Sequence, residues 1–121
     1  MAKLAETLPA GTYRRADGEP GPALHGWVTA QYSFDRYRSE PDTEGPRILL
    51  TKQAKAIEPA LAETGAVALV RDLVNTPAED MGPAQLEHEV EYIAKAASAD
   101  FRVTKGDMLE REFPMVHMVG R

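Results

Sequence analysis

One long stretch of helical periodicity constrains the fold of this 121-residue chain more than any other feature. Apolar residues recur at three- and four-residue spacing, which gathers them on one face of a helix: Leu61, Ala62, Ala66, Leu69, Val70 and Leu73. Pro59 suits the first turn, where its missing N–H costs nothing. The pattern stops at Asn75-Thr76-Pro77, since Asn tolerates the left-handed conformation and Pro77 restricts Thr76 to extended angles. We expect a helix that begins around Pro59 and ends at Asn75.

A second helix is predicted after the polar loop 77–82. Pro83 is suited to a first helical position, and Gly82 before it is a tolerable cap. Spacings of four, three and four residues then define one apolar stripe: Leu86, Val90, Ile93 and Ala97. The opposite face is charged, and we expect it to face water: Glu87, Glu89, Glu91 and Lys95.

Short apolar or alternating runs on either side of these helices are typical of strands: 47–51, 101–104 and 115–119. Asp107 can cap a short helix that ends at Phe113, before Pro114. From residue 47 the order is strand, helix, helix, strand, short helix, strand, which indicates an α/β fold with a partial, mixed or parallel sheet and flanking helices. Three strands make an incomplete sheet, and the chain stops directly after one of them, so we expect a fragment.

The first 46 residues give weaker signals. Residues 1–24 hold three glycines and three prolines among few periodic apolar positions, so we expect an irregular segment. The segment 26–32 fits a strand or a short helix. Four aromatic residues lie between Trp27 and Tyr37, and Gly45-Pro46 is a turn signal.

Composition excludes several classes of protein. No apolar run approaches the roughly 20 residues that span a bilayer, and the first residues lack the apolar core of a secretory signal. The absence of cysteine fits a reducing compartment, so the cytoplasm is the default. Residues 1–60 carry eight basic and eight acidic residues, whereas residues 61–121 carry six and eleven. The acidic second half would repel a phosphate backbone, so we expect no nucleic-acid partner there.

The histidines do not form a metal motif, because no two of His25, His88 and His117 are closer than 29 positions. His88 with Glu91 is better interpreted as a solvated helix face, and His117 as a structural histidine on a strand. No glycine-rich phosphate loop and no Gly-x-Ser-x-Gly elbow is present. We therefore assign no catalytic, no cofactor-binding and no metal-ligating residue.

One mixture of basic and aromatic residues allows a binding hypothesis. Arg14-Arg15 and Arg36/Arg38 accompany aromatic residues that could stack single-stranded nucleic acid: Tyr32, Phe34 and Tyr37. We favour the alternative, in which the rings pack on a core.

The stretch 68–86 resembles the interdomain segment of the leucyl aminopeptidase family, peptidase family M17. That family carries Arg-Asp/Glu-Leu-Val-Asn-x-Pro, here Arg71–Pro77, then a Met-Gly-Pro or Met-Thr-Pro, here Met81–Pro83, and then a helix. Weaker similarity extends downstream over 103–109 and 117–121, and upstream over Gly26-Trp27 and 32–37. The resemblance runs from about residue 22 to the end.

The resemblance implies a two-domain enzyme whose N-terminal α/β domain is similar to a macro domain and is joined to a catalytic domain by a long helix. The family removes N-terminal residues from peptides with two divalent metals, Zn or Mn, and forms hexamers. On this basis residues 1–60 are the C-terminal portion of the N-terminal domain, 61–98 the interdomain helices, and 99–121 the start of the catalytic domain.

The family's metal ligands come from a lysine–aspartate segment and an Asn-Thr-Asp-Ala-Glu-Gly-Arg-Leu signature, and neither occurs here. The segment 75–80 echoes the signature, but Pro77 replaces the aspartate ligand. No family catalytic residue carries over, so the chain alone is expected to be inactive. We expect structural roles instead: Arg71 bridging the helix to the following loop, and Asn75 capping the helix end.

Three functional hypotheses follow. The first is the N-terminal fragment of an M17-like aminopeptidase that serves folding or oligomer assembly. Its partners would be its own catalytic domain and further copies, peptide substrate would be bound only through the missing domain, and no membrane would be involved. The second is a nucleic-acid- or ligand-binding macro-like module. The third is an interaction domain that uses the aromatic segment 27–37.

Overall fold

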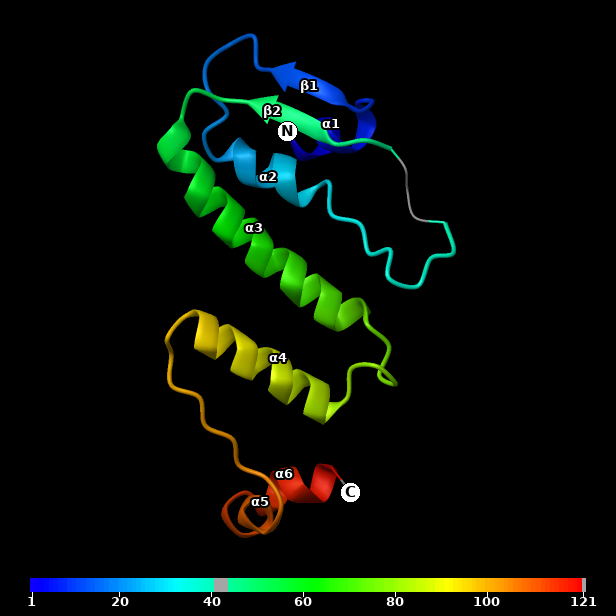
Figure 1. Ribbon diagram of the computed structural model, residues 1–121, viewed down its shortest axis with the longest axis vertical. Coiled ribbons are helices and arrows are strands. Elements are labelled where there is room, and N and C mark those ends of the chain that lie inside the picture. The colour runs from blue at the N-terminus through cyan, green and yellow to red at the C-terminus, as the bar shows by residue number, and fades with distance from the viewer. Residues whose placement is uncertain (41–43, 121) are drawn as a thin grey trace. The chain divides into compact units, whose positions relative to one another are not determined.

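The computed structural model describes residues 1–40 and 44–120 and divides into two compact units, Met1–Thr76 and Pro77–Arg121. The elements of the first unit are α1 (Ala2–Thr7), β1 (Gly11–Arg14), α2 (Ala23–Thr29), β2 (Arg47–Leu50) and α3 (Ala54–Asn75) (Figure 1). Those of the second are α4 (Pro83–Ala96), α5 (Asp107–Glu112) and α6 (Pro114–Val119). The assignment of 1–60, 61–98 and 99–121 to domain, linker and catalytic start stays a prediction.

The sheet of the first unit has two parallel strands. β1 pairs with β2 from Gly11 opposite Arg47 to Arg14 opposite Leu50, and α2 lies on the connection between them (Figure 1). The predicted strand at residue 47 is therefore confirmed. The prediction that 1–24 is irregular was wrong, because this segment contains α1 and β1. β1 is only four residues long, and pairing with a distant strand stabilises it, which a local pattern cannot reveal.

The core of the first unit surrounds Trp27, which lies on α2. The segment 26–32, which fitted a strand or a short helix by sequence, thus begins within a helix that ends at Thr29. Trp27 is 3% exposed. Its Nε1 donates to the Arg47 carbonyl at 2.9 Å, and its ring meets Tyr13 edge-on with centroids 5.8 Å apart. The Gln31 amide donates to the Arg47 carbonyl at 3.0 Å and accepts from the Arg47 N–H at 2.9 Å. These bonds hold the end of α2 against the start of β2.

Helix α3 is longer than its sequence pattern predicts. It spans 22 residues from Ala54, so Pro59 is an interior residue and not part of the first turn. The residues before Pro59 include alanine and lysine, which favour helix strongly enough to extend it past the proline. The predicted end at Asn75 is confirmed, and Thr76 is extended with φ −71° and ψ 125°. No left-handed residue ends the helix, since Ser98 is the one described non-glycine residue with positive φ.

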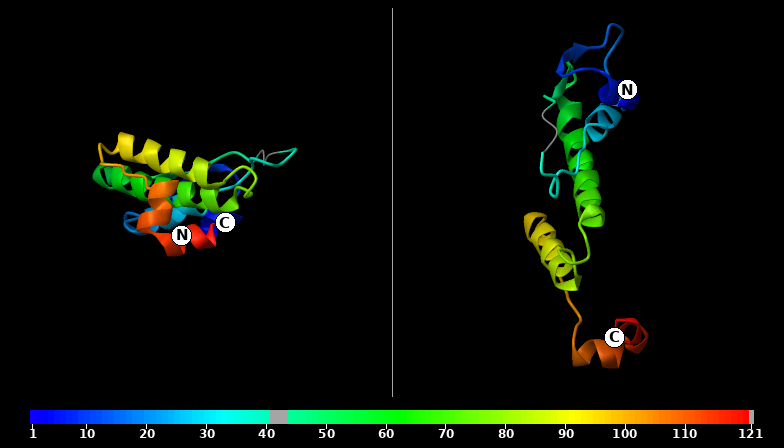
Figure 2. Two further views of the ribbon diagram at one scale, coloured as in Figure 1. Left: turned by 90° about the horizontal axis from the view of Figure 1, so that it is seen from below. Right: turned by 90° about the vertical axis from the view of Figure 1, so that its right-hand side faces the viewer.

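In the second unit, α4 begins at Pro83 as predicted, and the Gly82 N–H donates to Gln85 Oε1 at 3.2 Å. Both predicted strands were wrong. Residues 101–104 have no regular structure and 115–119 belong to α6. A strand needs a partner, and residues 77–120 as described contain none. The α5–α6 hairpin satisfies its backbone locally instead (Figure 2).

The short helix at 107 exists, but its cap differs from the prediction. Asp107 is the first residue of α5, and Gly106 is the cap, with φ 61°. Glycine reaches this positive φ at little cost, so it takes the cap position that Asp107 was expected to occupy. No helix in the described part of the chain is long and apolar enough to cross a membrane.

Candidate functional site

Polar residues of the Arg71–Pro77 motif converge on one side chain, Tyr32, from the last turns of α3. The Tyr32 hydroxyl donates to Asp72 Oδ1 at 2.5 Å, and Asn75 Nδ2 donates to the Tyr32 oxygen at 3.4 Å. Tyr32 lies 40 residues before Asp72, just beyond α2. The motif thus fastens the segment after α2 to the C-terminal end of α3. We call these residues (Tyr32, Arg71, Asp72 and Asn75) the tyrosine clamp.

Arg71 supplies two further contacts of the tyrosine clamp. Its guanidinium carbon lies 5.3 Å from the centroid of the Tyr32 ring, within cation–π range. Its Nη1 donates to the carbonyl of Thr29, the last residue of α2, at 3.2 Å. Arg71 therefore bridges α3 to the end of α2, whereas the sequence suggested a bridge to the loop that follows α3.

The clamp changes the acidity of its phenol. Burial raises the pKa of Tyr32 above its usual 10.0, and the hydrogen bond to Asp72 raises it further. Both effects favour the neutral phenol, which can donate to the carboxylate, whereas a phenolate would repel it. The clamp thus depends on a protonated phenol as the hydrogen-bond donor to Asp72.

Thr76 caps the end of α3, and the expectation that Asn75 does so was wrong. The Thr76 hydroxyl donates to the Asp72 carbonyl at 2.6 Å, and the Thr76 N–H bonds the same oxygen at 3.0 Å. Thr76 is buried, so these bonds satisfy groups that water does not reach. The sequence did contain a signal for this cap, because Thr76 is a hydroxyl residue that stands between the last helical position and Pro77.

The aromatic residues from 27 to 37 take different roles and do not form one surface. Trp27 is buried in the core and Tyr32 lies in the clamp. Phe34 and Tyr37 contact each other with ring centroids 5.9 Å apart, and the Arg36 guanidinium lies 5.6 Å from the Tyr37 ring. The prediction that the rings of Tyr32, Phe34 and Tyr37 pack on a core was wrong for Tyr37, which is 49% exposed, and neither of the other two rings is fully buried.

The histidines are dispersed, as their spacing indicates. His25 Nδ1 lies 3.3 Å from Glu63 Oε2, within ion-pair distance but without the alignment of a hydrogen bond. His117, now on α6 and not on a strand, has Nε2 4.0 Å from Glu110.

The carboxylates do not complete a metal site either. Glu91 pairs with Lys95 at 2.8 Å, and this contact lowers the pKa of Glu91. Within residues 1–40 and 44–120, no three His, Cys, Asp or Glu side chains are grouped so as to hold a metal ion. The donors in these residues do not fit a two-metal centre.

Comparison with known proteins identifies the region to which the chain corresponds. No protein-family model matches it. Peptidase B of Enterobacter sp. (strain 638) is 45% identical over 56 residues, which is 43% of this chain and 13% of that protein. A probable cytosol aminopeptidase of Wolinella succinogenes is 29% identical over 100 residues, 72% of this chain and 21% of that protein. The chain thus spans between an eighth and about a fifth of these relatives.

Solved structures indicate the same relationship as the sequence relatives. The crystal structure of cytosol aminopeptidase from Coxiella burnetii matches with a TM-score of 0.81 and 32% identity, over 95% of this chain and 26% of that one. The bottromycin maturation enzyme BotP in complex with Mn matches with a TM-score of 0.70 and 29% identity, over 91% and 26%. By sequence and by structure, the chain is therefore related to the N-terminal region of the leucyl aminopeptidase family, peptidase family M17.

Proposed function

We propose that this chain is the non-catalytic N-terminal region of an M17-type leucyl aminopeptidase, and that it functions by docking onto the catalytic remainder of that enzyme. One observation carries the proposal: most of its large apolar side chains are exposed. The buried hydrophobic residues among those described are only Ala5, Leu24, Trp27 and Ala94. Monomeric soluble proteins rarely leave large contiguous apolar surfaces uncovered.

The second unit shows this most clearly. Ala94 is its one buried hydrophobic residue within 77–120, while Met115 and Val119 are 82% and 88% exposed. Its exposed large apolar residues are Leu86, Val90, Tyr92, Ile93, Phe101, Val103, Met108, Phe113, Met115, Val116, Met118 and Val119. A segment with so little burial cannot offset the entropy of ordering its chain. We infer that a partner surface covers it.

Helix α3 adds a second apolar surface, on the first unit. Leu61, Val70 and Val74 are each more than half exposed. Val70 and Val74 are four residues apart and so lie on one face, which continues through the small residues Ala62 and Ala66. The relatives are in total about four to five times as long as the matched part, and the remainder provides the chain that would cover both surfaces.

The whole enzyme would remove N-terminal amino acids from peptides. The structural relative BotP was solved in complex with Mn. This supports the proposal that the whole enzyme, of which this chain would be a part, binds a divalent metal. Two such metals, Zn or Mn, would activate a water molecule and polarise the scissile carbonyl. Their ligands would lie outside the described residues of this chain, in which no three His, Cys, Asp or Glu side chains are grouped so as to hold a metal ion.

Assembly and location are part of the same proposal. We expect a homo-oligomer, a hexamer in this family, and a cytoplasmic location, which the name of the related cytosol aminopeptidases supports. Peptide substrate would be bound through the catalytic domain alone.

Co-elution of the chain with a separately produced downstream domain tests the docking step. Val90→Asp places a charge in the exposed apolar stripe of α4, where burial of an unpaired carboxylate should weaken the complex at least about tenfold. His88→Asp places the same residue on the charged side of α4 and is the matched control. Loss of co-elution with Val90→Asp alone is the expected result. Equal behaviour of both variants, or no complex with the unmodified chain, would refute docking through this stripe.

A further inference from the structure

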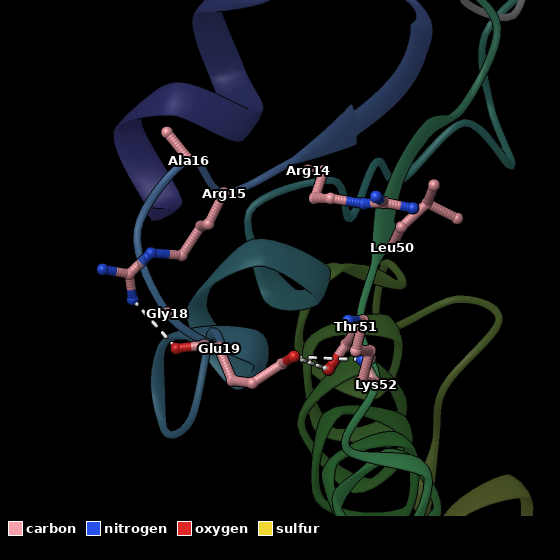
Figure 3. A pocket seen from close by; sticks show the side chains of 8 residues that line it. All are labelled: Arg14, Arg15, Ala16, Gly18, Glu19, Leu50, Thr51 and Lys52. Atoms are coloured by element: carbon pink, nitrogen blue, oxygen red, sulfur yellow. Dashed lines mark hydrogen bonds between the residues drawn. The ribbon is translucent and has the colours of Figure 1, made fainter.

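A polar cleft of about 370 Å³ lies where both strands end. β1 and β2 are parallel, so the residues that follow them meet at the same edge of the sheet. In α/β folds this carboxyl edge is the usual place for ligands. The lining residues, shown in Figure 3, are Arg14, Arg15, Ala16, Gly18, Glu19, Leu50, Thr51 and Lys52.

The wall of the cleft is a loop fastened to the end of β2. Glu19 Oε2 accepts from the Thr51 hydroxyl at 2.8 Å and from the Lys52 N–H at 3.0 Å. Arg15 Nη1 donates to the Glu19 carbonyl at 3.1 Å (Figure 3). Gly18 turns this loop with φ 64°, and no heavy atom lies within 4 Å of where its Cβ would be, so the loop leaves open space there. The cleft is thus held by hydrogen bonds between its own walls.

The charge of the cleft is positive although the chain carries −5. Among the lining residues, three are basic, Arg14, Arg15 and Lys52, and one is acidic, Glu19, which gives the lining an excess of two positive charges. Hydrogen bonds from Thr51 and from the Lys52 backbone lower the pKa of Glu19, so it stays ionised and engaged with the protein itself. Arg14 and Lys52 make no side-chain hydrogen bond or ion pair with any described residue, and Arg14 extends toward Leu50 (Figure 3).

We propose that this cleft binds the phosphate group of a small phosphate monoester. A phosphate monoester carries about −1.5 to −2 at pH 7, which matches the excess charge of the cleft, whereas a single carboxylate carries half as much. Arginine also matches phosphate oxygens through its fork of N–H donors. The volume lies near the lower limit of small-molecule sites, about 300 to 1,000 Å³, and leaves room for an organic group beside the phosphate. This inference does not depend on the aminopeptidase assignment.

Binding should be weak and sensitive to salt, because the basic side chains are exposed and screened by ions. Exposed charge pairs contribute little, so removing one cation should weaken binding by up to about fivefold. The measurement is a titration of the full chain at low salt, followed by backbone amide NMR signals. The probes are glycerol phosphate, inorganic phosphate, acetate and glycerol.

The expected result is a saturable shift of the Gly18, Glu19, Thr51 and Lys52 amides with both phosphates. Arg14→Gln and Lys52→Gln should weaken it, and Lys3→Gln, which removes the same charge on α1, should not. Tighter binding of glycerol phosphate would show that the organic group contributes, and equal binding that the phosphate alone is recognised. Equal shifts with acetate, equal loss in Lys3→Gln, or no saturable shift at these amides would each overturn the proposal.

Discussion

At the scale of single residues, one phenol joins two segments that lie far apart in the sequence. Tyr32 donates to Asp72, and Arg71 covers its ring. This hydrogen bond exists only while the phenol is protonated. The raised pKa of Tyr32 therefore makes a pH-dependent contribution to stability.

We predict that this contribution is complete below pH 10.0, the ordinary pKa of the phenol, and is lost as the pH rises through the higher pKa of the folded chain. The free energy of unfolding of the unmodified chain should then exceed that of Tyr32→Phe near neutrality and converge with it in strong alkali. Denaturant unfolding at a series of alkaline pH values measures the difference. If this difference in the free energy of unfolding stayed constant across the series, the phenolic proton would make no contribution to stability.

Glu19 gives the opposite pH dependence. Its pKa is lowered, first by the Thr51 hydroxyl and then by the Lys52 N–H. Its contribution to stability should be complete above pH 4.5, the unshifted value, and be lost as the pH falls through the lower folded pKa. Comparison of Glu19→Gln with the unmodified chain in acid isolates this carboxylate from the others. Parallel acid unfolding curves would exclude the predicted role.

The sequence motif pointed to Arg71, Asp72 and Asn75, but not to what they contact. Their shared partner, Tyr32, is about 40 residues away, and spacing along the chain carries no information on such a contact. Asn75 was therefore assigned to a cap, since that is its commonest local role. The cap itself, Thr76, depends on a bond to a carbonyl four residues back, a pattern that the sequence does contain.

At the scale of elements, Pro59 lies inside α3 and not at its start. An interior proline removes one helical hydrogen bond and crowds the preceding turn, at a cost of about 3 kcal/mol in an unstrained helix. We predict that Pro59→Ala raises the free energy of unfolding by about 1 to 3 kcal/mol, measured by denaturant unfolding. A fall, or no change, would place the beginning of the helix at Pro59, as the apolar periodicity alone suggested.

The two long helices, α3 and α4, were predicted better than the short elements, for a physical reason. The ends of α3 and α4 carry local signals, Asn75-Thr76-Pro77 and Gly82-Pro83, and both were confirmed. β1 has no such signal, because its stability comes from pairing with β2. Conversely, 115–119 has the composition of a strand, but it follows Pro114, which suits a first helical position, and it has no strand to pair with in the described second unit. It therefore belongs to a helix, α6.

At the scale of the whole molecule, burial is concentrated in the first unit. Trp27 and Leu24 are buried there, while the second unit buries only Ala94 among its described hydrophobic residues. We predict that backbone amides of 77–120 exchange with solvent much faster than those of α2 and α3, because little burial opposes local opening. Addition of the downstream domain should slow exchange in 77–120. Equal protection of both units in the chain alone would contradict the account.

The resemblance to M17 aminopeptidases was available from the sequence because it rests on a contiguous motif, and the relatives confirm it. The cleft at the strand ends could not be predicted from the sequence, because Arg14 and Lys52 come together only when β1 and β2 pair. Contiguous features are visible in a sequence, whereas sites assembled from distant segments depend on the fold.

Hydrolysis of leucine p-nitroanilide with added Mn²⁺ tests the central claim most directly. The chain alone, a separately produced downstream domain, and their mixture would be compared at equal concentrations. The account predicts no turnover by the chain alone and more turnover by the mixture than by the downstream domain alone. Metal-dependent turnover by these 121 residues alone would contradict the assignment of the catalytic groups to the rest of the enzyme. A mixture no more active than the downstream domain would contradict a supporting role for this region.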